Sequence, residues 1–304
     1  MTTTSLPTRA IDELADEQTV AGTDHARIPA GSRLVTVIES RSRRPWVDWR
    51  ELYQFRDLLR FLVWRHVQVQ YAQSVLGIGW AILPPALSMV IFTVVFGQLV
   101  KLDSEGAPYA LFSFTALVPW TYFSNVLQGA TVSLVQHTAL LSKVYFPRLL
   151  LPLSFALAKL IDFAVAFVLL LILMACWGQW PTYDIMVLPV LVIVLVLSAI
   201  GPSLILAALA VQYRDVKHAV PLLAQLLMFA APVVYPATLI PERYRLVYAV
   251  NPLVGVIEGF RAALLGTHAM PWNLIGVGAT SAVAMALMGI RYFRSREHLF
   301  ADVA

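Results

Sequence analysis

The stretch Leu140–Leu153, with the sequence LLSKVYFPRLLLPL, decides how the chain is arranged. It is a short basic segment between two apolar runs, and each of these runs is long enough to cross a bilayer. Lys143 and Arg148 predict that the segment lies on the cytoplasmic side of a membrane, because short loops rich in Lys and Arg stay inside. The segment therefore fixes the orientation of the helices on either side of it.

Four apolar residues, Val144–Pro147, lie between the two cations of this segment. Tyr145 and Phe146 add aromatic surface, and Pro147 interrupts any helix beside the charges. Aromatic and basic side chains are the residue types that most often anchor protein–protein contacts. The segment is therefore a candidate site for docking a soluble partner protein.

The composition indicates a multi-pass helical membrane protein. Of the 304 residues, 59% are hydrophobic and 13% are charged, whereas an ordinary soluble domain carries about 25% charged residues. The charges cluster and leave apolar runs of about 20 residues, which is the length that crosses a hydrocarbon core of about 30 Å. A membrane β-barrel would show alternating segments of about ten residues instead.

Charge, cysteine and histidine content exclude several functions. The net charge of +4 lies mostly near the ends of the apolar runs, which indicates membrane orientation and not nucleic-acid binding. The single cysteine, Cys176, excludes an internal disulfide and a multi-cysteine metal site. The histidines are scattered without metal-ligand spacing, so no metal site is expected. We also expect no secretory signal, because the first thirty residues lack an apolar core.

The N-terminal region divides into two parts of different character. Residues 1–45 are polar and are expected to form a disordered cytoplasmic tail, because they can bury little apolar surface. In residues 46–70, apolar side chains recur at helical spacing and alternate with arginines and tryptophans. This pattern is typical of an amphipathic helix in the membrane interface. A soluble helix packed on a partner is the alternative.

Six apolar runs predict six transmembrane helices in an all-α polytopic membrane protein. They lie near residues 78–100, 109–131, 153–176, 185–211, 217–235 and 272–290. Of the connections, 101–108 is net acidic and 177–183 lacks Lys and Arg, whereas 213–218 and the C-terminal tail are basic. Loop charge therefore alternates as expected for six spans in the inner membrane with both termini in the cytoplasm.

The apolar stretch 236–271 is not expected to be a seventh span. A seventh crossing would place the arginines of the C-terminal tail outside, against the charge rule. Its most apolar part, Leu246–Gly266, is also interrupted at Asn251 and Pro252, and the resulting pieces of about twelve residues reach about 18 Å each, which is too short to cross. We expect two short re-entrant helices on the periplasmic side, near 236–266, which would form an outer gate. Residues 46–304 then make up one transmembrane domain.

Four stretches together are similar to one protein family. They are Phe55–Trp80, Leu141–Pro152, Tyr213–Val216 and Asn251–Arg261. In this order and spacing they resemble the membrane permease of ABC-2 type polysaccharide exporters, which move O-antigen, capsule, teichoic acid or related lipid-linked glycans. The resemblance extends from about Val35 to about Arg296.

The resemblance implies both an architecture and partners. It implies six spans, an interface helix, two re-entrant outer helices, a homodimer and two copies of a separate nucleotide-binding ATPase. In such an assembly, Leu141–Arg148 would be the coupling helix that sits in a cleft of the ATPase, with Lys143, Tyr145, Phe146, Pro147 and Arg148 as coupling residues. The interface helix would help to form the cytoplasmic entrance, and paired first and fifth spans would line the glycan path. The entrance residues would be Arg56, Asp57, Arg60, Trp64 and Arg65.

The chain departs from the family pattern at the end of the interface helix. After Arg65, many members keep an acid and several cations, whereas this chain has His66, Gln68, Gln70 and Ala72. The entrance of this chain is therefore poorer in positive charge.

Nothing in the chain is suited to nucleotide binding or to catalysis. It contains no Gly-Lys pair of the kind that cradles a phosphate in a Walker A loop. No paired acids, Ser-His-Asp set or Cys-His set indicates an enzyme. We therefore expect no cofactor on this chain, with ATP and Mg²⁺ bound by the partner subunit.

Two pairs of opposite charges have i,i+3 spacing within apolar sequence. Lys159 and Asp162, in the third span, either neutralise one another as a structural pair or take part in transport. Glu258 and Arg261, in the expected gate, are either a solvated pair or a functional one, in which Arg261 latches the gate or meets an anionic glycan. Asn251 and Pro252 complete the gate residues.

Two further groups of residues have alternative interpretations. Arg214 and Asp215, at the inner end of the fourth span, either anchor the loop or contact the ATPase. Aromatic residues either line a path on which sugar rings stack or belong to the belt at the membrane interface. The aromatic candidates for the path are Tyr109, Phe112, Trp120 and Tyr235.

The favoured hypothesis is the transmembrane subunit of an ATP-driven exporter that moves a lipid-linked polysaccharide out across the cytoplasmic membrane. A gradient-driven secondary transporter or channel is the alternative, and it would depend on Asp162. An intramembrane glycosyl or acyl transferase is a third possibility, without a catalytic motif to support it.

Overall fold

The computed structural model describes residues 49–72, 74–137 and 146–297, which all belong to one compact unit, 44–304. The described residues form helices and turns and contain no strand. The predicted tail, 1–45, lies outside the described residues, as do Lys143 and Tyr145.

The predicted interface helix consists of two helices, α2 (Trp49–Gln54) and α3 (Arg56–Tyr71). The apolar run that follows is not one regular helix. A 3-10 turn, Gly77–Ala81, leads into α4 (Leu83–Phe92), and a π-helical segment, Thr93–Leu99, continues it. Pro84 and Pro85 lie in the first turn of α4, where the missing N–H of proline removes no helical hydrogen bond.

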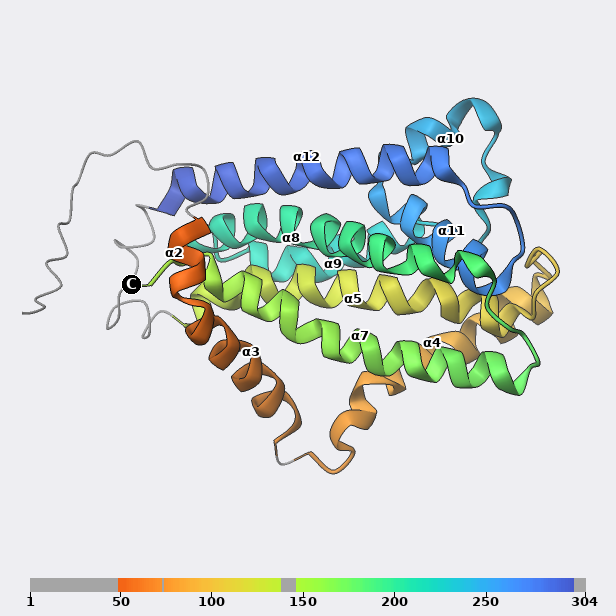
Figure 1. The fold of residues 1–304 in the computed structure, drawn as a ribbon, viewed down its shortest axis with the longest axis horizontal. Helices are drawn as coiled ribbons and strands as arrows, with labels where there is room; N and C mark the ends of the chain where they lie inside the picture. The colour runs from red at the N-terminus through yellow and green to blue at the C-terminus, as the bar shows by residue number, and fades with distance from the viewer. Residues whose placement is uncertain (1–48, 73, 138–145, 298–304) are drawn as a thin grey trace, which may run out of the picture. The chain divides into compact units, whose positions relative to one another are not determined.

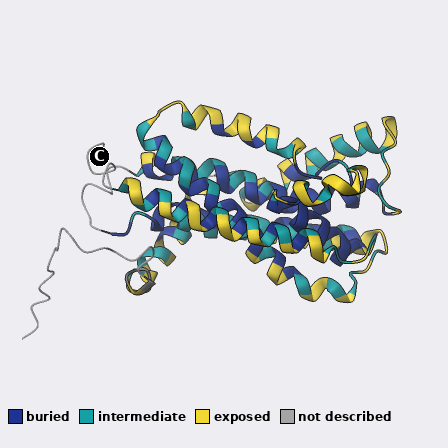
Figure 2. Ribbon diagram, turned by 90° about the horizontal axis from the view of Figure 1, so that it is seen from above, coloured by how far each residue is buried: buried dark blue, intermediate teal, exposed yellow. Residues whose placement is uncertain are grey.

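Four long helices form the body, and Figure 1 shows them running beside one another: α5 (Tyr109–Gln136), α7 (Leu150–Cys176), α8 (Leu188–Gln212) and α12 (Trp272–Arg296). α5 packs against both α7 and α8, and α8 packs in turn against α12. All ten residues from Leu111 to Trp120 on α5 are buried. α5 is therefore the central helix of the unit, whereas the outer faces of the other helices are exposed (Figure 2).

The close contact between α8 and α12 depends on two glycines. A Cβ atom added to Gly201 would lie 2.6 Å from the backbone carbonyl of Met285, and one added to Gly289 would meet the backbone of Gly201. Because neither glycine carries a side chain, the two backbones can approach closely, as small residues permit between membrane helices.

The region from 216 to 265 contains three short helices: α9 (Val216–Phe229), α10 (Glu242–Tyr248) and α11 (Pro252–Leu265). α10 and α11 meet at 111° across Asn251, so the sequence correctly placed a break in this apolar stretch. The Asn251 side chain accepts a hydrogen bond from the Leu253 N–H at 3.2 Å and donates one to the Ala230 carbonyl at 3.0 Å. It thus caps α11 and ties α11 to the end of α9.

Three segments of the described chain are long and apolar enough to cross a membrane: Leu150–Cys176, Tyr183–Gln212 and Trp272–Arg296. A fourth is added if the bent pair of α10 and α11 counts as one span. The three correspond to the spans predicted near 153–176, 185–211 and 272–290. Leu83–Leu99 and Val216–Phe229 are shorter apolar helices.

Candidate functional site

A buried ion pair lies on α11. Arg261 donates a hydrogen bond from Nη1 to Oε1 of Glu258 at 2.8 Å, and the two side chains are 0% and 3% exposed. The guanidinium carbon of Arg261 also lies 3.6 Å from the ring centre of Phe112 on α5, which is a cation–π contact. The burial excludes the alternative that Glu258 and Arg261 form a solvated surface pair.

The same pair holds the segment between α9 and α10. Arg261 donates to the carbonyls of Val233 at 3.1 Å and of Tyr235 at 3.3 Å, and the Ala237 N–H donates to Glu258 at 3.2 Å. The hydroxyl of Tyr109 donates to the Val234 carbonyl at 2.7 Å. Backbone groups of the segment Val233–Ala237 are thus satisfied by buried side chains of the protein.

His268 and Glu105 extend this ion pair into a network. Nε2 of His268 lies 3.0 Å from Oε2 of Glu258 and 3.8 Å from Oε2 of Glu105. The hydrogen bond to Glu258 raises the pKa of His268, although burial of the imidazole opposes this. The other oxygen of Glu105 accepts a hydrogen bond from Thr238 at 3.1 Å. We call Glu105, Glu258, Arg261 and His268 the outer network.

The outer network also contains a possible metal-binding group. Glu105, Glu258 and His268 place one potential ligand atom each within 4.8 Å of one another. This group could not be predicted from the sequence, because the three residues come from a turn, α11 and the loop before α12. Their ligand spacing follows no motif, and only the fold brings them together.

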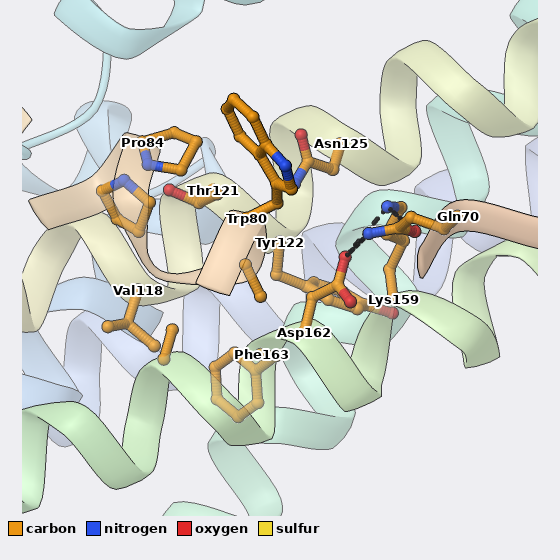
Figure 3. Close-up of a pocket in the computed structure, with 13 residues that line it drawn as sticks. Gln70, Trp80, Pro84, Val118, Thr121, Tyr122, Asn125, Lys159, Asp162 and Phe163 are labelled. Atoms are coloured by element: carbon orange, nitrogen blue, oxygen red, sulfur yellow. Dashed lines mark hydrogen bonds and ion pairs between the residues drawn. The ribbon is translucent and has the colours of Figure 1, made fainter. Parts of the chain in front are cut away.

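A second polar network connects α3 with α7 (Figure 3). Lys159 and Asp162 on α7 form the predicted ion pair, with 2.9 Å between Nζ and Oδ2. Gln70, near the end of α3, bonds to both: its carbonyl oxygen accepts from Lys159 at 2.7 Å, and its amide donates to Asp162 at 3.0 Å. The Tyr71 hydroxyl donates to the second oxygen of Asp162. We call Gln70, Tyr71, Lys159 and Asp162 the inner network.

The inner network borders a cavity of about 230 Å³. Figure 3 shows Lys159, Asp162 and Gln70 on one side of this cavity and Trp80 and Pro84 on another. Thr121 and Asn125 of α5 also line it, and they add a hydroxyl and an amide. Lys159 and Asp162 therefore face a space inside the protein, and their side chains are 13% and 12% exposed.

The entrance residues lie on the exposed face of α3. All five, Arg56, Asp57, Arg60, Trp64 and Arg65, are exposed. The opposite face is held by Leu62, which is buried, and by His66, whose ring lies 5.6 Å from that of His137 and 5.5 Å from that of Phe155. Burial lowers the pKa of His66 to about 4. The amphipathic pattern in the sequence thus correctly separated the two faces of this helix.

The described part of the coupling segment is packed against the body. Phe146 is 4% exposed and belongs to a small core with Leu62, Leu134 and Leu150. Pro147 is also buried, and Arg148 donates a hydrogen bond to the carbonyl of Glu297, next to the end of α12. The ring of Phe146 therefore anchors this part of the segment to the body.

The remaining candidates fall into two groups. Arg214 and Asp215 are exposed at the turn between α8 and α9. Tyr109, Phe112 and Trp120 are buried within the chain, and Tyr235 is half-buried, with its hydroxyl 3.0 Å from that of Tyr248. In this structure, Tyr109, Phe112 and Trp120 pack among the helices of the body.

The helical body, the broken helix pair at one end and the two internal ion-pair networks define a multi-pass membrane permease. Residues 57–265 match the family model described as the ABC-2 type transporter. The chain belongs to this family. In such a permease, nucleotide binding and hydrolysis belong to a partner ATPase subunit and not to the membrane chain.

Curated relatives come from several bacteria. The chain is 34% identical over 257 residues to the O-antigen export system permease protein RfbA of Myxococcus xanthus, covering 83% of this chain and 97% of that protein. It is 24% identical to an RfbA of Klebsiella pneumoniae over 249 residues, or 81% and 95% of the two chains. It is 23% identical to the polysialic acid transport protein KpsM of Escherichia coli over 236 residues, or 77% and 91%.

Proposed function

We propose that this chain is the permease subunit of an exporter that moves a lipid-linked polysaccharide, of the O-antigen or capsule type, out across the cytoplasmic membrane. The observation that carries the proposal is the similarity to an O-antigen export permease over 97% of that protein's length. The similarity to a polysialic acid transport protein supports the wider substrate class of bacterial surface polysaccharides.

The working assembly is a homodimer of this chain with two copies of the ATPase. Six crossings per chain result if α4 with its π-helical continuation, α5 and α9 cross the membrane together with α7, α8 and α12. The basic residues in the turn after α8 and at the end of α12 support a cytoplasmic location for that side and for both termini. The bent pair α10 and α11 then lies on the periplasmic side and serves as the outer gate.

α7 connects the coupling segment with the entrance. Arg148 lies two residues before α7 begins. Lys159 lies about 14 Å along α7 from its first residue, at 1.5 Å per residue. Gln70 and Tyr71 fasten the end of α3 to α7 at that point. When the ATPase closes on ATP and moves the coupling segment, α7 passes the motion to α3 and changes the entrance.

The outer network keeps the gate closed while the ATPase is idle. Arg261 and Glu258 hold the segment between α9 and α10 against α11, and Phe112 holds Arg261 against α5. Opening requires these contacts to rearrange, so that the polysaccharide passes between the two copies. ATP binding by the partner supplies the free energy.

Replacement of Arg148 by alanine tests the coupling role. We expect the Arg148→Ala variant to lose surface polysaccharide. The amount of chain in the membrane and its co-purification with the ATPase are measured in the same cells. Arg243→Ala, which removes an exposed cation from α10, is the matched control and should leave export normal. Normal export by Arg148→Ala at normal chain levels would refute the coupling assignment.

Phe146→Ala separates anchoring from coupling. Because the Phe146 ring is buried, its removal should cost about 3–5 kcal/mol of stability and lower the amount of chain in the membrane. If the level of Phe146→Ala stays normal and only export fails, Phe146 acts on the partner and not on the body.

A further inference from the structure

We propose that Glu105, Glu258 and His268 form a binding site for a divalent transition-metal ion of the Zn²⁺ type, which clamps the outer gate. The three potential ligand atoms are one imidazole nitrogen and two carboxylate oxygens, all within 4.8 Å of one another. Imidazole and carboxylate are ligands that Zn²⁺ accepts at bond lengths of about 2.0–2.2 Å. In a tetrahedral site with such bonds, neighbouring ligand atoms are roughly 3.3 Å apart.

The observed spacing is close to this requirement. Nε2 of His268 lies 3.0 Å from the nearest oxygen of Glu258 and 3.8 Å from the nearest oxygen of Glu105. Small side-chain rotations therefore bring the ligands to metal distance. Three protein ligands leave a fourth position for water, and the 24% exposure of the His268 side chain gives an ion access to the site.

The second nitrogen of His268 is already held as in a metal site. Nδ1 lies 3.0 Å from the carbonyl of Ala269, so it carries a hydrogen and donates. In this structure Nε2 donates to Oε2 of Glu258, and a metal ion bound between Nε2 and the two carboxylates would replace that hydrogen. A metal-binding histidine typically donates its other N–H to a backbone carbonyl or a carboxylate in this way.

The carboxylate of Glu105 is a separate indication that a cation binds here. Its Oε2 is buried and has no hydrogen-bond partner among the described residues, although its Oε1 accepts from Thr238. The backbone of Glu105 has a positive φ of 57°, which is uncommon for a residue other than glycine. A buried carboxylate oxygen without a donor is costly unless a cation meets it.

The local charge also permits a divalent ion. Glu258 uses Oε1 for Arg261 and for the Ala237 N–H, which leaves Oε2 for a ligand. Two carboxylates and one guanidinium give a net charge of −1 around a neutral His268. A proton on Nε2 is the competing occupant, and it would make the group a pure hydrogen-bonded ion cluster.

The proposed site would tie together three separate segments: the turn that holds Glu105, α11 with Glu258, and the loop before α12 with His268. Because α11 also carries Arg261, a bound ion would oppose any rearrangement of the outer network. The effect on the gate rests on the proposed function, whereas the binding of the metal ion does not, and the test below measures binding alone.

The test uses the purified permease–ATPase complex, without a polyhistidine tag, in lipid nanodiscs freed of metal. Zn²⁺ is added, and bound zinc per chain is measured by calorimetry and by elemental analysis. We expect one Zn²⁺ per chain, and binding at least about 100-fold weaker in each of the variants Glu105→Gln and His268→Gln, since loss of an outer-shell partner alone weakens a site 10–100-fold. Glu258 is left intact, because its loss also removes the partner of Arg261.

Two control variants and one spectrum complete the experiment. His218→Gln and Glu242→Gln remove exposed residues of the same types and should leave Zn²⁺ binding unchanged. Co²⁺ in place of Zn²⁺ should give the visible absorption of a four-coordinate ion, and this band should disappear in both site variants. If the unaltered complex binds Zn²⁺ no more tightly than the His268→Gln variant, the site holds a proton and not a metal, and the proposal is overturned.

Discussion

The outer and the inner network contain ion pairs of the same spacing but of different character. Glu258 and Arg261 are 3% and 0% exposed, and most of their partners are backbone groups of a non-helical segment. Lys159 and Asp162 are 12–13% exposed, border a cavity, and bond to side chains of another helix. The comparison teaches that i,i+3 spacing predicts an ion pair. The parts of the protein packed around the pair decide whether it holds a backbone segment or the side chains of another helix.

A third ion pair has the same spacing and is more exposed than the other two. Glu242 and Arg245 on α10 also have i,i+3 spacing, with 3.8 Å between charged atoms and side chains that are 91% and 32% exposed. The three pairs therefore form a graded set in which burial changes and sequence spacing does not. The predictions below use this set, and the effect expected from breaking each pair is larger where the pair is more deeply buried.

The largest effect is expected from Arg261→Met. The substitution leaves the Glu258 carboxylate buried beside fewer donors and removes the donors of two backbone carbonyls, which should cost about 3–5 kcal/mol of stability. The measurement is the thermal unfolding temperature of the purified chain, together with its level in the membrane.

The double variant Glu258→Gln, Arg261→Met sharpens this result. Because it removes both charges, it should be more stable than Arg261→Met alone. If the double variant is less stable than Arg261→Met, the unpaired Glu258 charge is not the main cause of the loss of stability. Burial of the pair then does not explain the difference between the outer and the inner network.

An intermediate effect is expected from Asp162→Asn. The amide keeps some hydrogen bonds but leaves Lys159 without its countercharge, at a cost of about 1–3 kcal/mol. The end of α3 should separate from α7, which is measured as a longer distance between spin labels at Val69 and Val168, two exposed positions. An unchanged distance would mean that α3 is held by its apolar face alone.

A smaller effect, dependent on pH, is expected at His66. Burial lowers the pKa of His66 to about 4, so the folded chain binds fewer protons than the unfolded chain between about pH 6.5 and pH 4. The contribution of His66 to the stability of the packing of α3 is therefore complete above pH 6.5 and decreases as the pH falls toward 4. The same spin-label pair should show the separation growing through this window in the unaltered chain.

His66→Gln provides the control for this measurement. Glutamine does not titrate, so its label distance should not change between pH 6.5 and pH 4. A change of the same size in both proteins would assign the pH response to another group.

The smallest effect is expected from Glu242→Gln. Because this pair is solvated and long, its loss should change the stability by less than about 0.5 kcal/mol. Thermal unfolding under the conditions used for Arg261→Met gives the comparison directly. A loss as large as that of Arg261→Met would show that burial does not order the three pairs.

Several elements of the fold could be predicted from the sequence for clear physical reasons. Long apolar runs with flanking charges predicted α7, α8 and α12, and Asn251-Pro252 predicted the break before α11. The first apolar run was harder, because its 3-10, α and π segments share the same apolar composition as a regular helix. Hydrophobicity determines that a segment is buried in lipid or protein, but it does not determine the local hydrogen-bond pattern.

The candidate site was predictable only where its residues are local in sequence. The pairs 159/162 and 258/261 follow from helical spacing. The link from Lys159 to Gln70 spans 89 positions, and the contact of His268 with Glu105 spans more, so no local pattern indicates either. The packing of Phe146 against Leu62, Leu134 and Leu150 also joins residues that are far apart in the sequence, so the cations beside Phe146 gave no indication of it.

The burial of α5 has a consequence for how the chain is synthesised. Four of its hydroxyl-bearing residues, Ser113, Thr115, Thr131 and Ser133, are buried and bond to carbonyls of their own helix, and α5 is not among the helices apolar enough to cross unaided. α7 and α8, which shield α5, leave the ribosome after it. In the proposed six-span arrangement, we therefore expect α5 to be inserted together with α7 and α8, after these helices have been translated.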